Sequence, residues 1–289
     1  MNYPKITIVT PSFNQGNYLE ETICSVLDQG YPNLEYIVID GGSTDQSVEI
    51  IKKYADRLSY WVSEKDKGMY DAIQKGFARS TGDVMAWINS DDKYYPRALS
   101  LIGEVFATLP QVNWLQGNPS NIDESSRIVS SFSSRRWSKY NFYMKDYKYI
   151  QQESTFWRRS LWEKAGSTLN VNLKYAGDFE LWLRFFDYEQ LYCLRTVVGQ
   201  FRLRTSNQFS LERLDDYNRE CESEIDAKLK KLDREIIENI AYLKKYWSIY
   251  SRIPYFKSKS KQKFDRIMNA PAGIVFAGRA SVSLYNNSV

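Results

Sequence analysis

Two adjacent carboxylates follow an apolar run in the chain: Val84 to Ile88 leads directly into Asn89-Ser90-Asp91-Asp92. Neighbouring carboxylates repel each other, so the pair is costly unless solvent or a cation lies between them. A divalent cation that also binds a phosphate would offset the repulsion, and hard cations prefer such oxygen ligands. Ser90, Asp91 and Asp92 are also good helix-capping residues ahead of Pro96, so a helix start remains an alternative.

The 289-residue chain contains no histidine, which excludes a His general base, a Ser-His-Asp triad and any His-containing zinc site. Its three cysteines, Cys24, Cys193 and Cys221, lie far apart and match no metal or redox spacing. We therefore expect a carboxylate to carry out any acid–base step, and a reducing, cytoplasmic compartment. The 22 Tyr and 8 Trp suit clefts that bind sugars or bases.

Apolar runs and helical patterns alternate through the first hundred residues. We expect strands at 5–11, 34–39, 59–63 and 83–88, with helices at 18–29, 47–54 and 70–80. This alternation predicts an α/β fold whose mainly parallel sheet is flanked by helices. Ligands of such sheets bind beyond the carboxyl ends of the strands. Polar clusters at 10–12, 40–43 and 89–92 follow three of these strands, which indicates one shared site.

Two common phosphate-binding motifs are missing from the sequence. No G-x-G-x-x-G follows the first predicted strand, and no G-x-x-x-x-G-K-S/T is present. A dinucleotide cofactor and a P-loop NTPase are therefore not expected.

The order Thr10-Pro11-Ser12-Phe13-Asn14, then Asp40-Gly41-Gly42-Ser43-Thr44-Asp45, then Asn89-Ser90-Asp91-Asp92 resembles the family 2 glycosyltransferases. The resemblance covers about residues 5 to 205. It implies a Rossmann-like GT-A domain over 1–205, with a nucleotide-binding half at about 1–112 and an acceptor half at 113–205. It also implies an inverting transfer of sugar from a nucleotide-sugar, foremost a UDP-sugar, with Mg²⁺ or Mn²⁺. The acceptor would be a hydroxyl of a glycan or lipid-linked molecule in polysaccharide synthesis.

The resemblance assigns residues to the nucleobase. Pro11 and Phe13 match base-packing positions, and Asp40 matches the acid that accepts a hydrogen bond from the pyrimidine N–H. An ionised carboxylate only accepts hydrogen bonds, which suits that role. Asp66 and Lys67 are candidates for base or phosphate contacts, although a solvated charged loop explains them equally well. A loop aromatic at Phe13 and a turn acid at Asp40 are the corresponding structural alternatives.

The metal and diphosphate positions depart from the family pattern. The resemblance implies ribose and metal contacts at Asn89, Asp91 and Asp92, with the two acids as metal ligands. Many relatives carry Asp where Asn89 stands. Many also place a His near Arg204, and an arginine holds phosphate but cannot ligate a cation. We therefore expect Arg204 at the diphosphate and a metal held by few protein groups.

The acceptor side is expected at Gln152 and Glu153 and at the start of a helix near Asp178. Relatives usually carry Glu-Asp there, and the Asp serves as catalytic base, whereas this chain has Gly177-Asp178. Inversion at the anomeric carbon requires one base to take the acceptor proton. An acid favoured by the helix dipole is the structural alternative for Asp178, and Glu180 is the second candidate base.

Residues 206–289 are predicted to form a helical C-terminal extension with a basic tail. Helical spacing over 211–250 predicts an apolar stripe for core packing, a helical pair or a homodimer. From Lys244 onward, nine Lys or Arg face one acid, Asp265. This tail suggests peripheral contact with anionic membrane, with a disordered tail as the alternative. No nucleic-acid module accompanies the charge, and no signal peptide or transmembrane segment is expected.

Two other functions share this fold. A non-catalytic nucleotide-sugar-binding assembly subunit stays open because of Gly177, Asn89 and Arg204. A nucleotidylyltransferase would be expected to show a basic, Gly-rich loop after the first strand, and residues 12–17 lack the basic residue.

Overall fold

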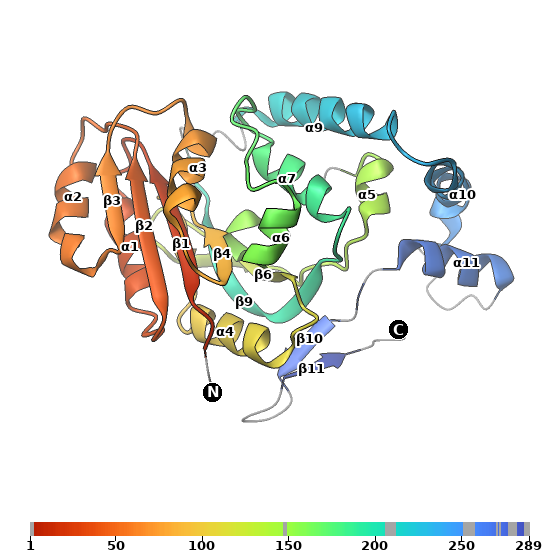
Figure 1. Cartoon of the computed structure of the whole chain (residues 1–289), viewed down its shortest axis with the longest axis horizontal. Helices are drawn as coiled ribbons and strands as arrows, with labels where there is room; N and C mark the ends of the chain where they lie inside the picture. The colour runs from red at the N-terminus through yellow and green to blue at the C-terminus, as the bar shows by residue number, and fades with distance from the viewer. Residues whose placement is uncertain are drawn as a thin grey trace.

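The computed structural model describes residues 3–146, 149–205, 212–250, 258–269, 271, 273–276 and 282–285. Strands and helices alternate in the first part of the chain, as predicted (Figure 1). They are β1 (Ile6–Ser12), α1 (Leu19–Leu27), β2 (Leu34–Asp40), α2 (Ser47–Lys53), β3 (Tyr60–Ser63), α3 (Met69–Arg79) and β4 (Val84–Trp87).

These four strands form a parallel sheet in the order β3-β2-β1-β4. The register pairs Ser12 with Asp40 and Asp40 with Ser63. The carboxyl ends of β1, β2 and β3 therefore end level at one edge. The strand order reverses around β1, which is where open α/β sheets bind ligands.

The second part continues the same sheet with mixed direction. It comprises β5 (Lys93–Tyr94), α4 (Ala98–Thr108), β6 (Trp114–Ile122), β7 (Ile128–Ser131), α5 (Lys139–Tyr143), a 3₁₀ turn (Gln152–Ser154), β8 (Thr155–Arg158), α6 (Arg159–Lys164), α7 (Gly177–Phe185) and β9 (Tyr192–Arg202). β8 runs antiparallel to both of its neighbours, β4 and β6. The prediction of a mainly parallel sheet is therefore confirmed for the part of the chain through β4, whereas the rest of the sheet is mixed.

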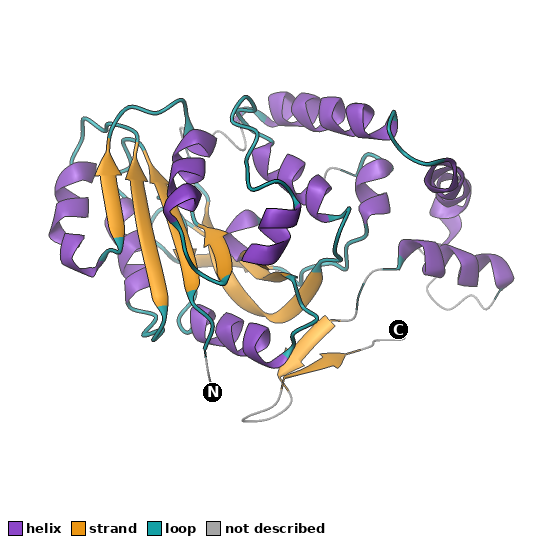
Figure 2. Cartoon of the chain, in the orientation of Figure 1, coloured by secondary structure: helices purple, strands orange, loops and turns teal. Residues whose placement is uncertain are grey.

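Helices cover both faces of the sheet (Figure 2), and an apolar core lies on each face. Alternation along β1 separates them, because Ile6 and Ile8 pack toward α1 and α4, whereas Val9 packs toward α3 and α7. In the second core the ring of Trp87, the last residue of β4, stacks on Trp182 of α7 with centroids 5.8 Å apart. This stack links the end of β4 to the helix that begins beside Asp178.

The C-terminal extension is helical first and then returns to the sheet. Its elements are α9 (Leu214–Leu229), α10 (Arg234–Tyr250), α11 (Lys259–Met268), β10 (Gly273–Phe276) and β11 (Val282–Tyr285). β10 pairs in parallel with β9, and β11 pairs with β10, at the lower edge in Figure 1. The sequence predicted helices alone here. The short apolar run of β10 was missed, because it becomes a strand only by pairing with β9 and β11.

The apolar stripe predicted over 211–250 packs within its own chain. Cys221, Ile225 and Leu243 are fully buried in the core that α7 shares. The homodimer and the membrane contact stay predictions. Of the basic tail, Lys244 and Lys245 lie in α10 and the next four described basic residues lie in α11, whereas Arg252, Lys257 and Arg279 lie outside the described residues. Within the described part of the chain, no helix has the length and apolarity needed to cross a membrane.

Candidate active site

The stretch Asn89-Ser90-Asp91-Asp92 forms a turn at the carboxyl end of β4 and does not cap a helix. The next helix, α4, starts at Ala98 with Arg97 at its N-cap, after the intervening strand β5. The helix-start alternative is therefore wrong. The turn lies beside β1, since Ile88 donates its N–H to the carbonyl of Val9 at 2.9 Å.

Two arginines from the end of β9 hold this turn. Arg202 is fully buried, donates its backbone N–H to Asp92 Oδ1 at 2.9 Å, and donates Nε–H to the carbonyl of Asp91 at 2.7 Å. Arg204 Nη2 lies 3.1 Å from Asp91 Oδ2. Arg204 was predicted to lie in this region, whereas no role was predicted for Arg202. The sequence did offer a signal for Arg202. Arg202 and Arg204 are two residues apart, which places both side chains on one face of an extended chain.

The carboxylates of Asp91 and Asp92 differ in exposure. This difference decides which of them can bind a cation. Asp91 is 17% exposed and is ion-paired with Arg204. Asp92 is 1% exposed, and burial together with the charges of Asp91 and Glu153 raises its pKa well above the usual range. No group of three or more acidic or cysteine side chains suited to a metal occurs within the described ranges. An accessible carboxylate fits a Mg²⁺ or Mn²⁺ that is otherwise held by phosphate oxygens. Asp91 meets this requirement, whereas Asp92 is enclosed.

The Asp40 side chain accepts hydrogen bonds from the turn after β2. It is fully buried and accepts them from the N–H groups of Gly42 at 3.1 Å and Ser43 at 2.9 Å. The hydroxyls of Ser43 and Ser63 donate to it at 2.5 and 2.7 Å. Both carboxylate oxygens are occupied, so the structure favours the turn-acid alternative over a direct nucleobase contact.

Asp66 occupies the space that a side chain at Gly41 would need. A Cβ on Gly41 would lie 2.6 Å from Asp66 Oδ2. Asp66 Oδ1 accepts the N–H of Gly68 at 2.8 Å, and burial raises the pKa of Asp66. A carboxylate therefore does stand beside the end of β2, but it comes from the loop after β3.

The other predicted base-packing residues lie at the same edge. Phe13 follows β1 and is 59% exposed, whereas Pro11 is buried within β1. The loop carrying Phe13 is tied to the β2 turn, because the N–H of Asn14 donates to Ser43 Oγ at 2.8 Å. Lys67 is exposed in the loop after β3.

Asp178 lies in the first turn of α7 and is partly exposed. The hydroxyl of Tyr70 donates to the carbonyl of Tyr175 at 2.9 Å and lies 3.3 Å from Asp178 Oδ1. Burial raises the pKa of Asp178 to about 6, opposed by hydrogen bonds from the Phe179 N–H and Tyr70. A carboxyl group tuned in this way suits a general base.

Glu153 and Gln152 connect the β4 turn with the region around Asp178. Glu153 is buried, and burial together with the Asp178 charge raises its pKa to about 7. The charge of Glu153 in turn raises the pKa of Asp92. Within the described residues, both polar side-chain atoms of Gln152 are buried without a hydrogen-bond partner. The structure thus brings the β4 turn, Glu153 and Asp178 into one electrostatically connected region.

The second candidate base, Glu180, has a structural partner. Arg184 donates from Nε and Nη2 to the two oxygens of Glu180 at 2.7 and 2.8 Å. This bidentate pair within α7 holds the carboxylate away from a catalytic role.

Tyr70 explains why no acid precedes Asp178. A Cβ on Gly177 would lie 2.8 Å from the Tyr70 ring. We predict that Gly177→Ala lowers the free energy of unfolding by about 1–3 kcal/mol, because the added methyl group overpacks this contact. Urea denaturation measures the change. The loss should shrink in a Tyr70→Ala background, and equal losses in both backgrounds would contradict the contact as its cause.

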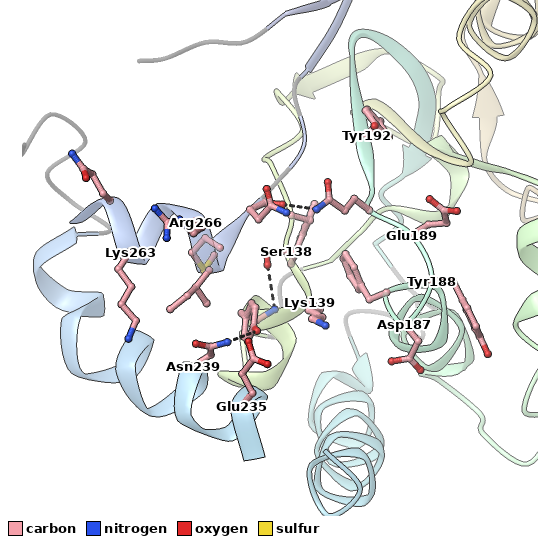
Figure 3. Close-up of a pocket in the computed structure, with 18 of the residues that line it drawn as sticks. Ser138, Lys139, Asp187, Tyr188, Glu189, Tyr192, Glu235, Asn239, Lys263 and Arg266 are labelled. Atoms are coloured by element: carbon pink, nitrogen blue, oxygen red, sulfur yellow. Dashed lines mark hydrogen bonds between the residues drawn. The ribbon is translucent and has the colours of Figure 1, made fainter. Parts of the chain in front are cut away.

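A cavity of about 940 Å³ lies elsewhere, between α5, the turn after α7 and α11 (Figure 3). Its lining includes Ser138, Tyr188, Asn239, Lys263 and Arg266. None of the predicted site residues lines it, so it is separate from the strand-end site.

Comparison with known proteins identifies the family. The family model described as Glycosyl transferase family 2 matches residues 7–163. The chain belongs to glycosyltransferase family 2. An uncharacterised glycosyltransferase of Rickettsia prowazekii (strain Madrid E) is 28% identical to this glycosyltransferase over 241 residues, which span 80% of this chain and 74% of the relative. A Bacillus subtilis (strain 168) glycosyltransferase named for teichuronic acid biosynthesis, TuaG, is 36% identical over 94 residues, covering 32% of this chain and 37% of TuaG.

Solved structures share the GT-A fold of this glycosyltransferase. Staphylococcus aureus TarS 1-349 in complex with UDP-GlcNAc superposes with a TM-score of 0.64 at 17% identity, covering 91% of this chain and 79% of that chain. The mannosyltransferase PcManGT of Pyrobaculum calidifontis, in complex with GDP-Man and Mn²⁺, superposes with a TM-score of 0.61 at 16% identity, covering 92% and 74%. At these identities the likeness shows the fold alone.

Proposed function

We propose that this glycosyltransferase transfers a sugar from a UDP-sugar, with inversion, to a hydroxyl of a glycan or lipid-linked acceptor in polysaccharide synthesis. The observation that carries the proposal is Asp178, a partly exposed carboxyl group whose pKa of about 6 suits a base. The Trp87–Trp182 stack connects its helix to the turn that bears Asp91. The name of TuaG supports a role in polysaccharide synthesis.

In the proposed reaction, Asp178 accepts the proton of the acceptor hydroxyl. The hydroxyl oxygen forms a bond to the anomeric carbon as the bond from that carbon to the diphosphate oxygen breaks. Arg204 would stabilise the negative charge on the leaving diphosphate. A Mg²⁺ or Mn²⁺ held by Asp91 would supply further neutralisation when bound. Gln152 and Glu153 would orient the acceptor.

The ionisation of Asp178 predicts the pH dependence. Only the ionised carboxylate can accept a proton, so the transfer rate should fall about tenfold per pH unit below about pH 6 and level off above it. A single-turnover assay from pH 4.5 to 8.5 measures this limb, with the circular dichroism spectrum as the control for folding. A rate independent of pH down to pH 5 would contradict the assignment.

The donor base is proposed to be uracil, read by Asp66. A carboxylate accepts the N3–H of uracil, whereas it would face the N3 lone pair of cytosine. We predict that Asp66→Asn weakens UDP binding about 10- to 150-fold, equivalent to about 1.5–3 kcal/mol for a hydrogen bond to a charged group. Isothermal titration calorimetry measures the affinity.

Two substitutions that move the acid from position 66 to position 41 provide the control for Asp66. Gly41→Asp alone should bind UDP poorly, because the new side chain would meet Asp66. The double variant Gly41→Asp/Asp66→Gly returns one acid to the same space and should recover part of the affinity. Wild-type UDP binding by Asp66→Asn would remove Asp66 from the base-binding site.

A donor screen tests the function as a whole. In a thermal-shift assay with Mn²⁺, UDP-sugars should raise the melting temperature more than GDP- or dTDP-sugars, since ligands of the native state stabilise it. The best donor should also show slow hydrolysis or transfer. Binding without any turnover would favour the non-catalytic assembly subunit instead.

A further inference from the structure

Glu220 of α9 binds the backbone immediately before the proposed base. Its carboxylate accepts the N–H groups of Lys174 at 3.0 Å, Tyr175 at 2.9 Å and Ala176 at 2.8 Å. Asp178 is only two residues beyond Ala176. The contact joins the C-terminal extension to the acceptor half, and α9 lies over α7 in Figure 1.

The helix that carries Asp178 needs such an acceptor. The first N–H groups of a helix have no partner within it. The N-cap residue of α7 is Ala176, whose side chain cannot accept a hydrogen bond. Glu220 accepts the N–H of this N-cap residue and those of the two residues before it, and its negative charge suits the positive end of the helix dipole.

The same segment is held from its opposite side. The Tyr70 hydroxyl donates to the carbonyl of Tyr175 at 2.9 Å, so α3 and α9 both bind the residues that precede Asp178. Amide-to-carboxylate hydrogen bonds are charge-assisted and stronger than neutral ones. Glu220 therefore restricts the position of the turn from which the Asp178 side chain projects.

We propose that Glu220 is a positioning residue for the catalytic base, so that the C-terminal extension completes the active site of this glycosyltransferase. The inference rests on the proposed role of Asp178. It gives α9 a function beyond packing, because a base displaced by about 1 Å can cost about 100-fold in rate.

Several titratable groups face Asp178, and Glu220 is one of them. Tyr70 comes from α3, Tyr149 and Glu153 come from the segment before β8, and Tyr217 and Cys221 come from α9. The charge of Glu220 raises the pKa of Asp178. Removing that charge should therefore make the base ionise at lower pH, which shows that Glu220 lies close to Asp178, while the change in kcat at high pH reports its positioning role.

The test compares Glu220→Gln with Glu222→Gln in the full-length chain. Glu222 lies on the same helix and pairs with Lys145 at the surface, so its substitution removes an equal charge away from the base. Glu220→Gln should lower kcat about 10- to 100-fold, leave the KM for the donor within about twofold, and move the acid limb of the pH–rate profile to lower pH. Glu222→Gln should match the wild type in all three.

A second variant, Glu220→Asp, separates the effect of the charge from the effect of the side-chain length. Glu220→Asp keeps the charge but withdraws the carboxylate by one methylene, so kcat should fall while the acid limb moves less than in Glu220→Gln. If Glu220→Gln fails to bind UDP, the Glu220→Asp variant provides the test of the positioning role instead. Wild-type kcat and an unmoved acid limb in the folded variant would overturn the role of Glu220. Full activity of Asp178→Asn would instead overturn the proposed function.

Discussion

Asp178→Asn should abolish glycosyl transfer while donor binding is retained. An asparagine has nearly the same shape but cannot accept the proton of the hydroxyl, and a positioned general base typically contributes about 100- to 10,000-fold to the rate. We therefore expect kcat to fall by a factor in that range, with the UDP affinity unchanged. Single-turnover transfer and isothermal titration calorimetry measure the two quantities.

Glu180→Gln is the matched control for Asp178→Asn. It changes a carboxylate two residues away on the same helix, where Arg184 already binds both oxygens. Its main effect should be a lower melting temperature, with kcat within a fewfold of the wild type. If Glu180→Gln were inactive and Asp178→Asn active, Glu180 would be the base and the proposed geometry would be wrong.

Arg204→Ala should produce the second large effect. The guanidinium lies 3.1 Å from Asp91 Oδ2, so Arg204 would be placed to contact a diphosphate bound beside this carboxylate. Hydrogen bonds to charged groups contribute about 1.5–3 kcal/mol, so kcat/KM for the donor should fall about 10- to 150-fold. Initial rates over a range of UDP-sugar concentrations measure this loss.

The metal response distinguishes the role of Arg204 from simple packing. Without the arginine, Asp91 loses its cationic partner, and the rate should depend more steeply on Mn²⁺ concentration. Arg204→Lys keeps a point charge but loses the planar fork, so it should fall between the wild type and Arg204→Ala. An unchanged kcat/KM in Arg204→Ala at every Mn²⁺ concentration would exclude a diphosphate contact.

The nucleotide half was predictable because its signals are local. β-branched runs end in polar clusters, and the carboxyl ends of parallel strands must meet at one edge. The strands and helices through β4 accordingly lie within a few residues of their predicted bounds. The turn at Asn89 to Asp92 was predicted as part of a site because two other strands also end in polar clusters.

The sequence left residues undecided or missed them where the deciding contact is long-range. Asp40 and Asp66 are 26 positions apart, and only the folded loop shows that Asp66 fills the space beside Gly41. Arg202 reaches Asp91 and Asp92 across more than a hundred residues. Such pairings depend on how the sheet is assembled, and no local period or cap encodes them.

The sequence by itself therefore determined the family resemblance, the α/β fold class and the strand ends that form the site. The tertiary structure alone decided which carboxylate stands beside the end of β2, why Gly177 precedes Asp178, and how α9 reaches the base. The physical reason is that propensity and periodicity act over a few residues. Steric exclusion at Gly41 and Gly177, and the three hydrogen bonds to Glu220, exist only after distant segments have packed together.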